Sequence, residues 1–404
     1  MSRILFLADL NPNKLGSMEE HALFLSKELN SRGHVCYLAF TAEPDAAFRR
    51  LFTEAGARLV TFDCLHGVSV VKDAKRIWGA IASLYRVVRE NRIDIVHINQ
   101  AKLTKICFWG IFVTGAQIVF TNHDSGFPYP RKPLKNFVAK ILHTYVTHRV
   151  SRYIAVSDFV RGRQRQTHYV DGVKSLTLYN GVNLERFIPG DMVAARKQLG
   201  LPLDSKILCS VAMLIPEKGL QHLIAAVAQL VHADDIKELL AVIVGEGSYR
   251  DELVRLAAEM GVTEQVLFLG RRNDVQTLVA AADVVVVPST WQESFGLIIA
   301  EAMSGAKPVV ASRTGGIPEL IDDRSTGMLV EPGDPQELAQ RIRELLENPD
   351  MRRSLGQAAR DKAGRMFNLS RQVDSLVDLY EELLKKPSLI SARILHVNQR
   401  RRHP

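Results

Sequence analysis

Cysteine is scarce in this sequence: only four are found among 404 residues, and they stand far apart. They show no spacing typical of metal ligands, and so few thiols do not make a disulfide scaffold. This usage fits a reducing compartment, and the cytoplasm is therefore the expected location. The four are Cys36, Cys64, Cys107 and Cys209.

Long apolar runs are also missing. The most apolar stretch, residues 106–120, is interrupted by Gly, Thr and Gln, and it is shorter than the roughly 20 residues that span a bilayer. We interpret it as a buried helix followed by a buried strand. The first ten residues carry one basic residue and no cleavage signature, so they predict a first β-strand rather than a signal peptide.

Acidic metal motifs are absent as well. The sequence contains no Asp-x-Asp and no His/Asp/Glu cluster at metal spacing, and no carboxylate stands out as a nucleophile or dedicated base. No nucleic-acid recognition fold is indicated, and the basic residues lack the interleaved aromatics that stack on bases. Nucleic acid is therefore not an expected partner.

The net charge of +8 is unevenly distributed. Residues 1–190 hold 26 Lys and Arg against 15 Asp and Glu, whereas residues 191–384 hold 20 against 29. The last twenty residues add six basic residues and no acid. Such asymmetry predicts that the first half and the tail meet something anionic.

Strand-like apolar runs alternate with amphipathic helical stretches along the whole chain, a pattern typical of parallel sheets with helical crossovers. The length exceeds what one compact core holds, and Pro189 and Gly190 interrupt the pattern midway. We therefore predict two doubly wound α/β domains, at 1–188 and 189–365, with ligands beyond the carboxyl ends of the strands in a cleft between them. The expected strands are 3–9, 34–40, 58–63, 94–99, 117–123 and 152–157, then 206–212, 240–245, 265–270, 284–289, 307–312 and 327–332.

Residues 293–301, "ESFGLIIAE", place Glu301 at the end of an aliphatic run. The segment predicts a loop entering a helix, where the free N–H groups of Phe295, Gly296 and Leu297 can face an anion. Glu301 would then lie one to two turns inside the helix. A buried carboxylate needs a polar partner, so this residue either faces solvent or meets a bound ligand.

The stretch 287–321 resembles the retaining glycosyltransferases of family four (group 1), which have the two-Rossmann-domain GT-B fold. The resemblance rests on the two glutamates eight positions apart, on the Ser-Phe-Gly between them and on "GGIPELI" (315–321), and it extends over most of the chain. It implies that Glu293 lies at the transferred sugar and that Glu301 holds the donor ribose. Ser294, Phe295, Gly296 and Leu297 then surround the donor phosphates.

Other residues match the same family. Lys218 in "PEKGL" is implied to grip the donor diphosphate, and Arg271 to lie where the nucleobase is read. Gly16 is implied to let backbone approach a phosphate, and His123 to lie beside the sugar. For each, an ordinary structural or solvent-exposed role remains the alternative.

One departure from the family pattern stands out. The family usually has an arginine five residues before the lysine, and this sequence has Met213, which cannot neutralise a phosphate. Ser17 follows Gly16 where the family often has a second glycine. Arg313 or Arg271 could compensate. An inactive or accessory homologue that partners an active transferase therefore stays open.

The resemblance implies a retaining, metal-independent glycosyltransferase that uses a UDP- or GDP-linked sugar as co-substrate and needs no other cofactor. The acceptor would be a glycan or lipid-linked molecule in cell-envelope, lipopolysaccharide or exopolysaccharide biosynthesis. A sugar-nucleotide 2-epimerase of the same fold is a second alternative.

The basic, amphipathic segment 129–149 suggests either peripheral contact with the inner face of an anionic cytoplasmic membrane or an acidic glycan, or else a solvated helix packed on its own sheet. Residues 366–386 predict a last helix that crosses back to the first domain, and 387–404 a basic tail.

Overall fold

The computed structural model describes residues 1–12, 15–40, 42–61, 74–99, 114–123, 149–168, 174–233, 236 and 238–385. The chain divides into two compact units. Unit 1 comprises Met1–Gly181 and the chain from Leu369 onward, and unit 2 comprises Val182–Asn368. The chain thus passes between units after residues 181 and 368, where the sequence predicted 188 and 365.

Unit 1 holds a parallel sheet in the order β3-β2-β1-β4-β5-β6-β7. Its order reverses between β1 and β4, as in doubly wound sheets. The strands are β1 (Arg3–Leu10), β2 (Val35–Phe40), β3 (Arg58–Thr61), β4 (Ile95–Ile98), β5 (Gln117–Asn122), β6 (Arg152–Ala155) and β7 (Ser175–Thr177). Its helices are α1 (Ser17–Ser31), α2 (Ala46–Glu54), α3 (Ala74–Glu90), α6 (Asp158–His168) and α15 (Leu369–Lys385).

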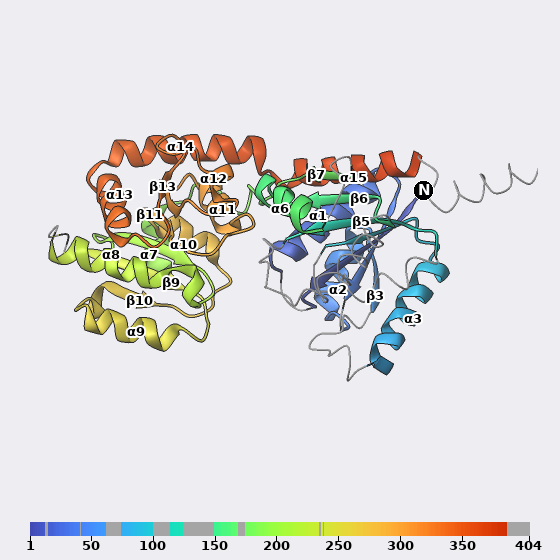
Figure 1. The fold of residues 1–404 in the computed structure, drawn as a ribbon, viewed down its shortest axis with the longest axis horizontal. Helices are drawn as coiled ribbons and strands as arrows, with labels where there is room; N and C mark the ends of the chain where they lie inside the picture. Colours follow the sequence, from blue (N-terminus) through green and yellow to red (C-terminus); the bar gives the residue numbers. More distant parts are fainter. Residues whose placement is uncertain are drawn as a thin grey trace, which may run out of the picture. The chain divides into compact units, whose positions relative to one another are not determined.

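Unit 2 holds a second parallel sheet in the order β10-β9-β8-β11-β12-β13 (Figure 1). The strands are β8 (Lys206–Val211), β9 (Leu239–Val244), β10 (Val266–Phe268), β11 (Val284–Val287), β12 (Val309–Ser312) and β13 (Met328–Val330). The helices are α7 (Met192–Leu199), α8 (Leu220–His232), α9 (Arg250–Glu259), α10 (Val275–Ala281), α11 (Leu297–Ser304), α12 (Ile317–Leu320), α13 (Pro335–Glu347) and α14 (Pro349–Met366), with the short 3₁₀ turns η1 (Pro216–Lys218) and η2 (Thr263–Gln265).

The predicted α/β class with two parallel sheets is confirmed. Each expected strand is found, and β7, a three-residue strand, was not predicted from the sequence. The strand half of the stretch 106–120 belongs to β5, whereas residues 106–113 lie outside the described part of the chain. Among the described helices, none combines the length and the apolar character that crossing a membrane requires.

Helix α15 packs in unit 1 although it follows the whole of unit 2 in the sequence (Figure 1). It lies against α1 and buries a stripe of apolar side chains in the core that β1, β2 and α1 share. The stripe recurs every three or four residues, as an amphipathic helix requires. It consists of Leu369, Val373, Leu376, Val377, Tyr380 and Leu383.

A buried hydrogen-bond chain connects α15 to the centre of the sheet. The Tyr380 hydroxyl lies 2.5 Å from His97 Nδ1, and His97 Nε2 lies 2.7 Å from the Thr121 hydroxyl. All three residues are buried. Burial lowers the pKa of His97 well below its usual value and raises the pKa of Tyr380, so both side chains are neutral at pH 7. Each ring nitrogen of His97 therefore has a neutral hydrogen-bond partner.

We expect Tyr380→Phe to lower the free energy of unfolding by about 1–3 kcal/mol, because it leaves a buried imidazole nitrogen without its partner. Urea unfolding of the purified chain measures this as a shift in midpoint. The control is Tyr153→Phe: Tyr153 is also buried, but its hydroxyl makes no hydrogen bond with the described residues. Equal shifts for the two variants would contradict the role of the chain.

Candidate functional site

The central strands of unit 2 mark where a ligand is expected. The strand order reverses between the neighbours β8 and β11. Strands β9 and β10 follow on the outer side of β8, and strands β12 and β13 follow on the outer side of β11. Parallel α/β sheets bind ligands in the crevice beyond the carboxyl ends of strands at such a reversal. Lys218 follows β8 and Glu293 follows β11, so these two predicted site residues flank this point.

The structure brings Lys218 and Glu293 together as an ion pair. Lys218 Nζ lies 2.5 Å from Glu293 Oε1, and the two side chains are only 22% and 15% exposed. The hydroxyl of the fully buried Ser289 donates to the same oxygen over 2.9 Å. Oε1 therefore has two donors, whereas no described residue makes a hydrogen bond or ion pair to Oε2.

Backbone contacts hold the two loops in this geometry. The carbonyl oxygen of Glu217 accepts the N–H groups of Thr290 (2.9 Å) and Trp291 (3.1 Å). Gly219 has a left-handed φ of 70°, and a Cβ there would lie 1.8 Å from the carbonyl oxygen of Pro288. Only glycine allows this approach.

The loop after β12 closes around Glu293 from the other side. The N–H of Gly316 donates to the Glu293 carbonyl over 2.7 Å. Gly315 has a φ of 58°, and a Cβ there would lie 2.2 Å from the same oxygen. Three loops, from β8, β11 and β12, thus meet at the pair.

Helix α11 begins at Leu297, four residues after Glu293. Its N-cap, Gly296, has a φ of 100° and no side chain to cap the helix. The first N–H groups of a helix lack intrahelical partners, so the backbone here can donate to an anion. The side chain of Phe295 is buried against Phe367, with ring centroids 5.5 Å apart, which leaves only its backbone for a ligand.

The remaining predicted residues of this segment are placed as follows. Leu297 is the first residue of α11, and Glu301 lies in its second turn. Ser294, Leu297 and Glu301 are half-buried. Glu301 is thus neither a freely exposed residue nor a fully buried charge, and its contact with a donor ribose stays a prediction.

The position at which the family usually has an arginine, residue 213, is exposed to solvent. Met213 is 61% exposed just after β8. The turn that follows β9 packs directly on this stretch, because a Cβ at Gly245 would lie 1.9 Å from the Ala212 carbonyl oxygen and one at Gly247 2.2 Å from that of Leu214. The two glycines therefore shape the loop that carries Met213.

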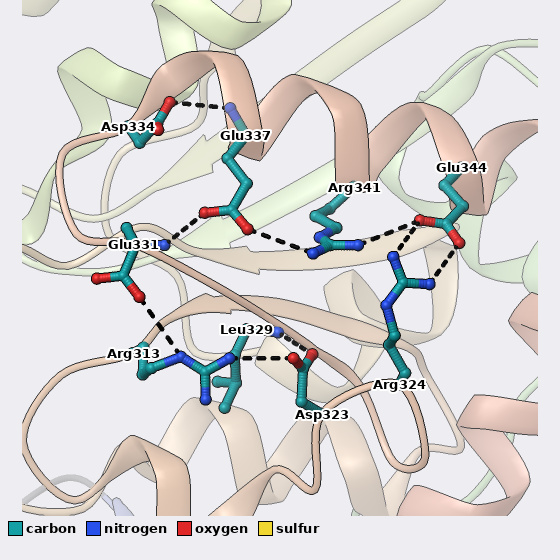
Figure 2. Close-up of polar contacts among 9 residues, drawn as sticks. All are labelled: Arg313, Asp323, Arg324, Leu329, Glu331, Asp334, Glu337, Arg341 and Glu344. Atoms are coloured by element: carbon teal, nitrogen blue, oxygen red, sulfur yellow. Dashed lines mark hydrogen bonds and ion pairs between the residues drawn. The ribbon is translucent and has the colours of Figure 1, made fainter.

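Neither suggested replacement for that arginine makes a hydrogen bond or ion pair with Lys218 or Glu293. Arg271 is an exposed residue after β10. Arg313 is shared between two carboxylates, at 3.0 Å from Asp323 and 3.6 Å from Glu331. Figure 2 shows it between Asp323 and Glu331, within a set of ion pairs and hydrogen bonds that continues through Glu331 to α13. The suggestion that Arg313 compensates for Met213 therefore has no support in the structure.

In unit 1 the loop after β1 is organised by Glu19, a buried residue of α1. Its two carboxylate oxygens accept the N–H groups of Asn11 (2.6 Å) and Gly16 (2.9 Å). A Cβ at Gly16 would lie 2.8 Å from Glu19 Oε2. Gly16 thus begins α1 with its N–H already engaged, and its predicted approach to a phosphate stays a prediction.

His123 directly follows β5, and Asn99 directly follows β4, so both residues lie at the carboxyl ends of neighbouring strands in unit 1. His123 Nε2 lies 3.0 Å from Asn99 Oδ1, an acceptor, so Nε2 carries the proton. Burial lowers the pKa of His123 to about 4. Burial, and then the nearby His123, lower the pKa of His21 to about 4 as well. At neutral pH His123 is therefore uncharged, and its Nδ1 can accept a hydrogen bond.

Several residues of these sites were not singled out from the sequence. Ser289 follows a run of valines like any strand-end residue, and Asn99 and Glu19 carry no motif of their own. For Ser289 and Asn99, the position just after the carboxyl end of a strand was the only available signal. No group of three or more His, Cys, Asp or Glu side chains suited to a metal ion occurs within the described ranges.

The two halves of the chain match two family descriptions. "Glycosyl transferases group 1" matches residues 191–362, and "Glycosyltransferase Family 4" matches residues 18–186. Together with the two Rossmann-like sheets, these matches show that the chain belongs to the group 1 glycosyltransferases, whose fold class is GT-B.

Individual proteins are similar to different extents. The D-inositol 3-phosphate glycosyltransferase of Saccharomonospora viridis is 37% identical over 217 residues, which are 52% of this chain and 50% of that protein. This chain therefore spans about half the length of that relative. An Escherichia coli UDP-Gal:alpha-D-GlcNAc-diphosphoundecaprenol alpha-1,3-galactosyltransferase is 28% identical over 78% of this chain and 81% of its own length.

Among solved structures, the Anabaena protein HepE in complex with UDP and glucose has a TM-score of 0.79 and 26% identity. The alignment covers 95% of this chain and 100% of that one. The confirmed part of the resemblance is thus the family and its fold.

We expect Gly219→Ala to destabilise unit 2 more than Gly200→Ala. Both glycines have a left-handed φ, 70° and 67°, but a Cβ at Gly200 meets nothing within 4 Å. The control should therefore cost only the left-handed backbone term of about 1–2 kcal/mol, whereas Gly219→Ala should add about 1–3 kcal/mol of overpacking. Thermal unfolding measures both, and equal losses would show that the loops do not approach this closely.

Proposed function

We propose that this chain is a retaining, metal-independent glycosyltransferase that moves a sugar from a nucleoside-diphosphate sugar to a glycan or lipid-linked acceptor. The observation that carries the proposal is the Lys218–Glu293 pair, held at the strand-order reversal of unit 2 just before the uncapped start of α11. A cation, a carboxylate and free helix N–H groups in one place suit a sugar diphosphate.

A uridine nucleotide is the proposed donor. The HepE structures contain UDP, with glucose or as UDP-glucose, and the name of the Escherichia coli relative specifies UDP-Gal. These names favour UDP over GDP. Lys218 and the N–H groups near Ser294–Leu297 would take the diphosphate charge that a metal ion takes in other enzymes.

The individual roles follow from this placement. Glu293 would hold hydroxyls of the transferred sugar and Glu301 the ribose, while Arg271 would lie by the base. Gly16 is proposed to let the backbone approach a phosphate, and His123 to lie beside the sugar, where its neutral Nδ1 accepts a hydrogen bond from a hydroxyl group. The C1–oxygen bond to the diphosphate breaks, the acceptor oxygen bonds to C1 on the same face, and the acceptor proton passes to the leaving phosphate.

The acceptor is proposed to be lipid-linked, in cell-envelope or exopolysaccharide assembly. The support is the name of the Escherichia coli relative, which specifies a diphosphoundecaprenol-linked acceptor. The segments on which peripheral membrane contact was predicted, residues 129–148 and the tail 387–404, lie outside the described residues.

The accessory homologue is the second candidate, and one observation favours it. Met213 stands exposed where the family usually has the arginine that bridges the diphosphate, and a charge-assisted hydrogen bond contributes about 1.5–3 kcal/mol. Hydrolysis of donor without acceptor would separate an enzyme from an inactive partner. Product analysis would separate transfer from 2-epimerisation.

A thermal-shift screen with UDP, GDP, UDP-glucose, UDP-galactose and GDP-mannose tests the donor site. We expect one nucleotide series to stabilise the wild type, and Lys218→Ala and Glu301→Ala to lose the shift because the diphosphate and ribose contacts are gone. The control, Lys197→Ala, removes an exposed lysine of α7 and should keep it. If no nucleotide stabilises the folded wild type, the accessory role is favoured.

Met213→Arg should strengthen donor binding. The side chain is exposed five residues before Lys218, so an arginine fits without burial, and one charge-assisted contact corresponds to about 10-fold or more in affinity. Titration calorimetry with UDP measures the change, with Met213→Leu as the uncharged control. An affinity equal to that of the control would place the diphosphate away from residue 213.

A further inference from the structure

Ser289 has an unusual combination of burial and polar contacts. It is the second residue after β11, it is fully buried, and its hydroxyl lies near three acceptors. These are Glu293 Oε1 at 2.9 Å, the Glu217 carbonyl at 3.2 Å and the Trp291 carbonyl at 3.5 Å. A hydroxyl has a single proton to donate, so only one of them receives it.

The carboxylate is the strongest of the three acceptors. It is the nearest, and hydrogen bonds to an ionised acceptor are roughly twice as strong as neutral ones. The Glu217 carbonyl already accepts two backbone N–H groups, from Thr290 and Trp291, and the Thr290 hydroxyl lies 3.2 Å from it. The proton of Ser289 is therefore donated to Glu293.

We propose that Ser289 is a positioning residue that orients Glu293 for the donor sugar. This proposal rests on the proposed function. Ser289 and Lys218 converge on Oε1, and Oε2 has no hydrogen bond or ion pair with the described residues. Holding one oxygen fixes the plane of the carboxylate, so Oε2 is the atom presented to a sugar hydroxyl.

Lys218 and Ser289, which both donate a hydrogen bond to Glu293 Oε1, behave differently once a sugar nucleotide binds. Lys218 is a flexible cation on η1, and a diphosphate competes with Glu293 for its charge. Ser289 is short, buried and fixed beside β11, so it stays on Oε1 when Lys218 turns to the phosphate. Ser289 is then the partner that keeps Glu293 in place during transfer.

A purely structural role for the hydroxyl is a weaker explanation. The loops that carry Glu217 and Glu293 are already joined by the two backbone hydrogen bonds to Glu217 and by the close approach at Gly219. Neither depends on the side chain of Ser289. Removing its hydroxyl should therefore disturb the orientation of one carboxylate more than the path of the backbone.

The experiment compares Ser289→Ala with the wild-type full chain in two measurements. Titration calorimetry gives the affinities for UDP and for UDP-glucose, UDP-galactose and UDP-N-acetylglucosamine. Donor turnover is then measured with whichever of these three the wild type cleaves fastest. We expect UDP affinity to stay unchanged, because UDP lacks the sugar that Glu293 meets. The affinity that the sugar adds should be lost, and turnover should fall about 10- to 100-fold, as misplaced catalytic groups do.

The matched control is Ser304→Ala. Ser304 is also buried in unit 2, and its hydroxyl donates one hydrogen bond, to the Phe187 carbonyl at 2.9 Å. Ser304→Ala should lower the thermal midpoint about as much as Ser289→Ala does. It should leave intact the additional affinity that the donor sugar provides.

Three outcomes would overturn the proposal. In the first, Ser289→Ala behaves like the wild type. In the second, it loses UDP and sugar-nucleotide affinity together, which would show a structural role. In the third, the wild type binds neither UDP nor any of the three sugar nucleotides, and then the donor site itself is refuted.

Discussion

The carbonyl oxygen of Glu217 is the point on which the arrangement of unit 2 depends. It takes two backbone N–H groups from the loop after β11 and so ties together the two loops that diverge from the strand-order reversal. The next residue along the chain is Lys218, which is thereby held against Glu293. A backbone contact, insensitive to side-chain chemistry, thus sets the distance between two side chains that carry charge.

That contact exists only because the backbone comes unusually close. Gly219 lies where any Cβ would overlap the Pro288 carbonyl, and Gly315 lies where one would overlap Glu293. Both have positive φ, a conformation that other residues adopt only at a cost. The glycines thus allow three loops to meet at the ion pair, and the partial burial of its two side chains strengthens its electrostatics.

Unit 1 uses its polar groups differently. His97 is locked between Tyr380 and Thr121 inside the core, whereas His123 lies at the carboxyl end of β5 beside Asn99. Burial keeps both imidazoles neutral at pH 7 by lowering their pKa values. The first therefore anchors α15 to the sheet, and the second presents an uncharged nitrogen that can accept a hydrogen bond from a hydroxyl group.

The amino-acid order by itself determined the α/β class, twelve of the strands and the family, because these follow from local periodicity and from a contiguous motif. It did not reveal that Ser289 and Lys218 share one oxygen of Glu293, that Phe295 turns into the core, or that Arg313 is engaged by Asp323 and Glu331. Those facts depend on loops from β8, β11 and β12 that are distant in sequence and meet only when the strands lie side by side. Only the tertiary structure decides which side chains lie within hydrogen-bond reach of one another across such separations.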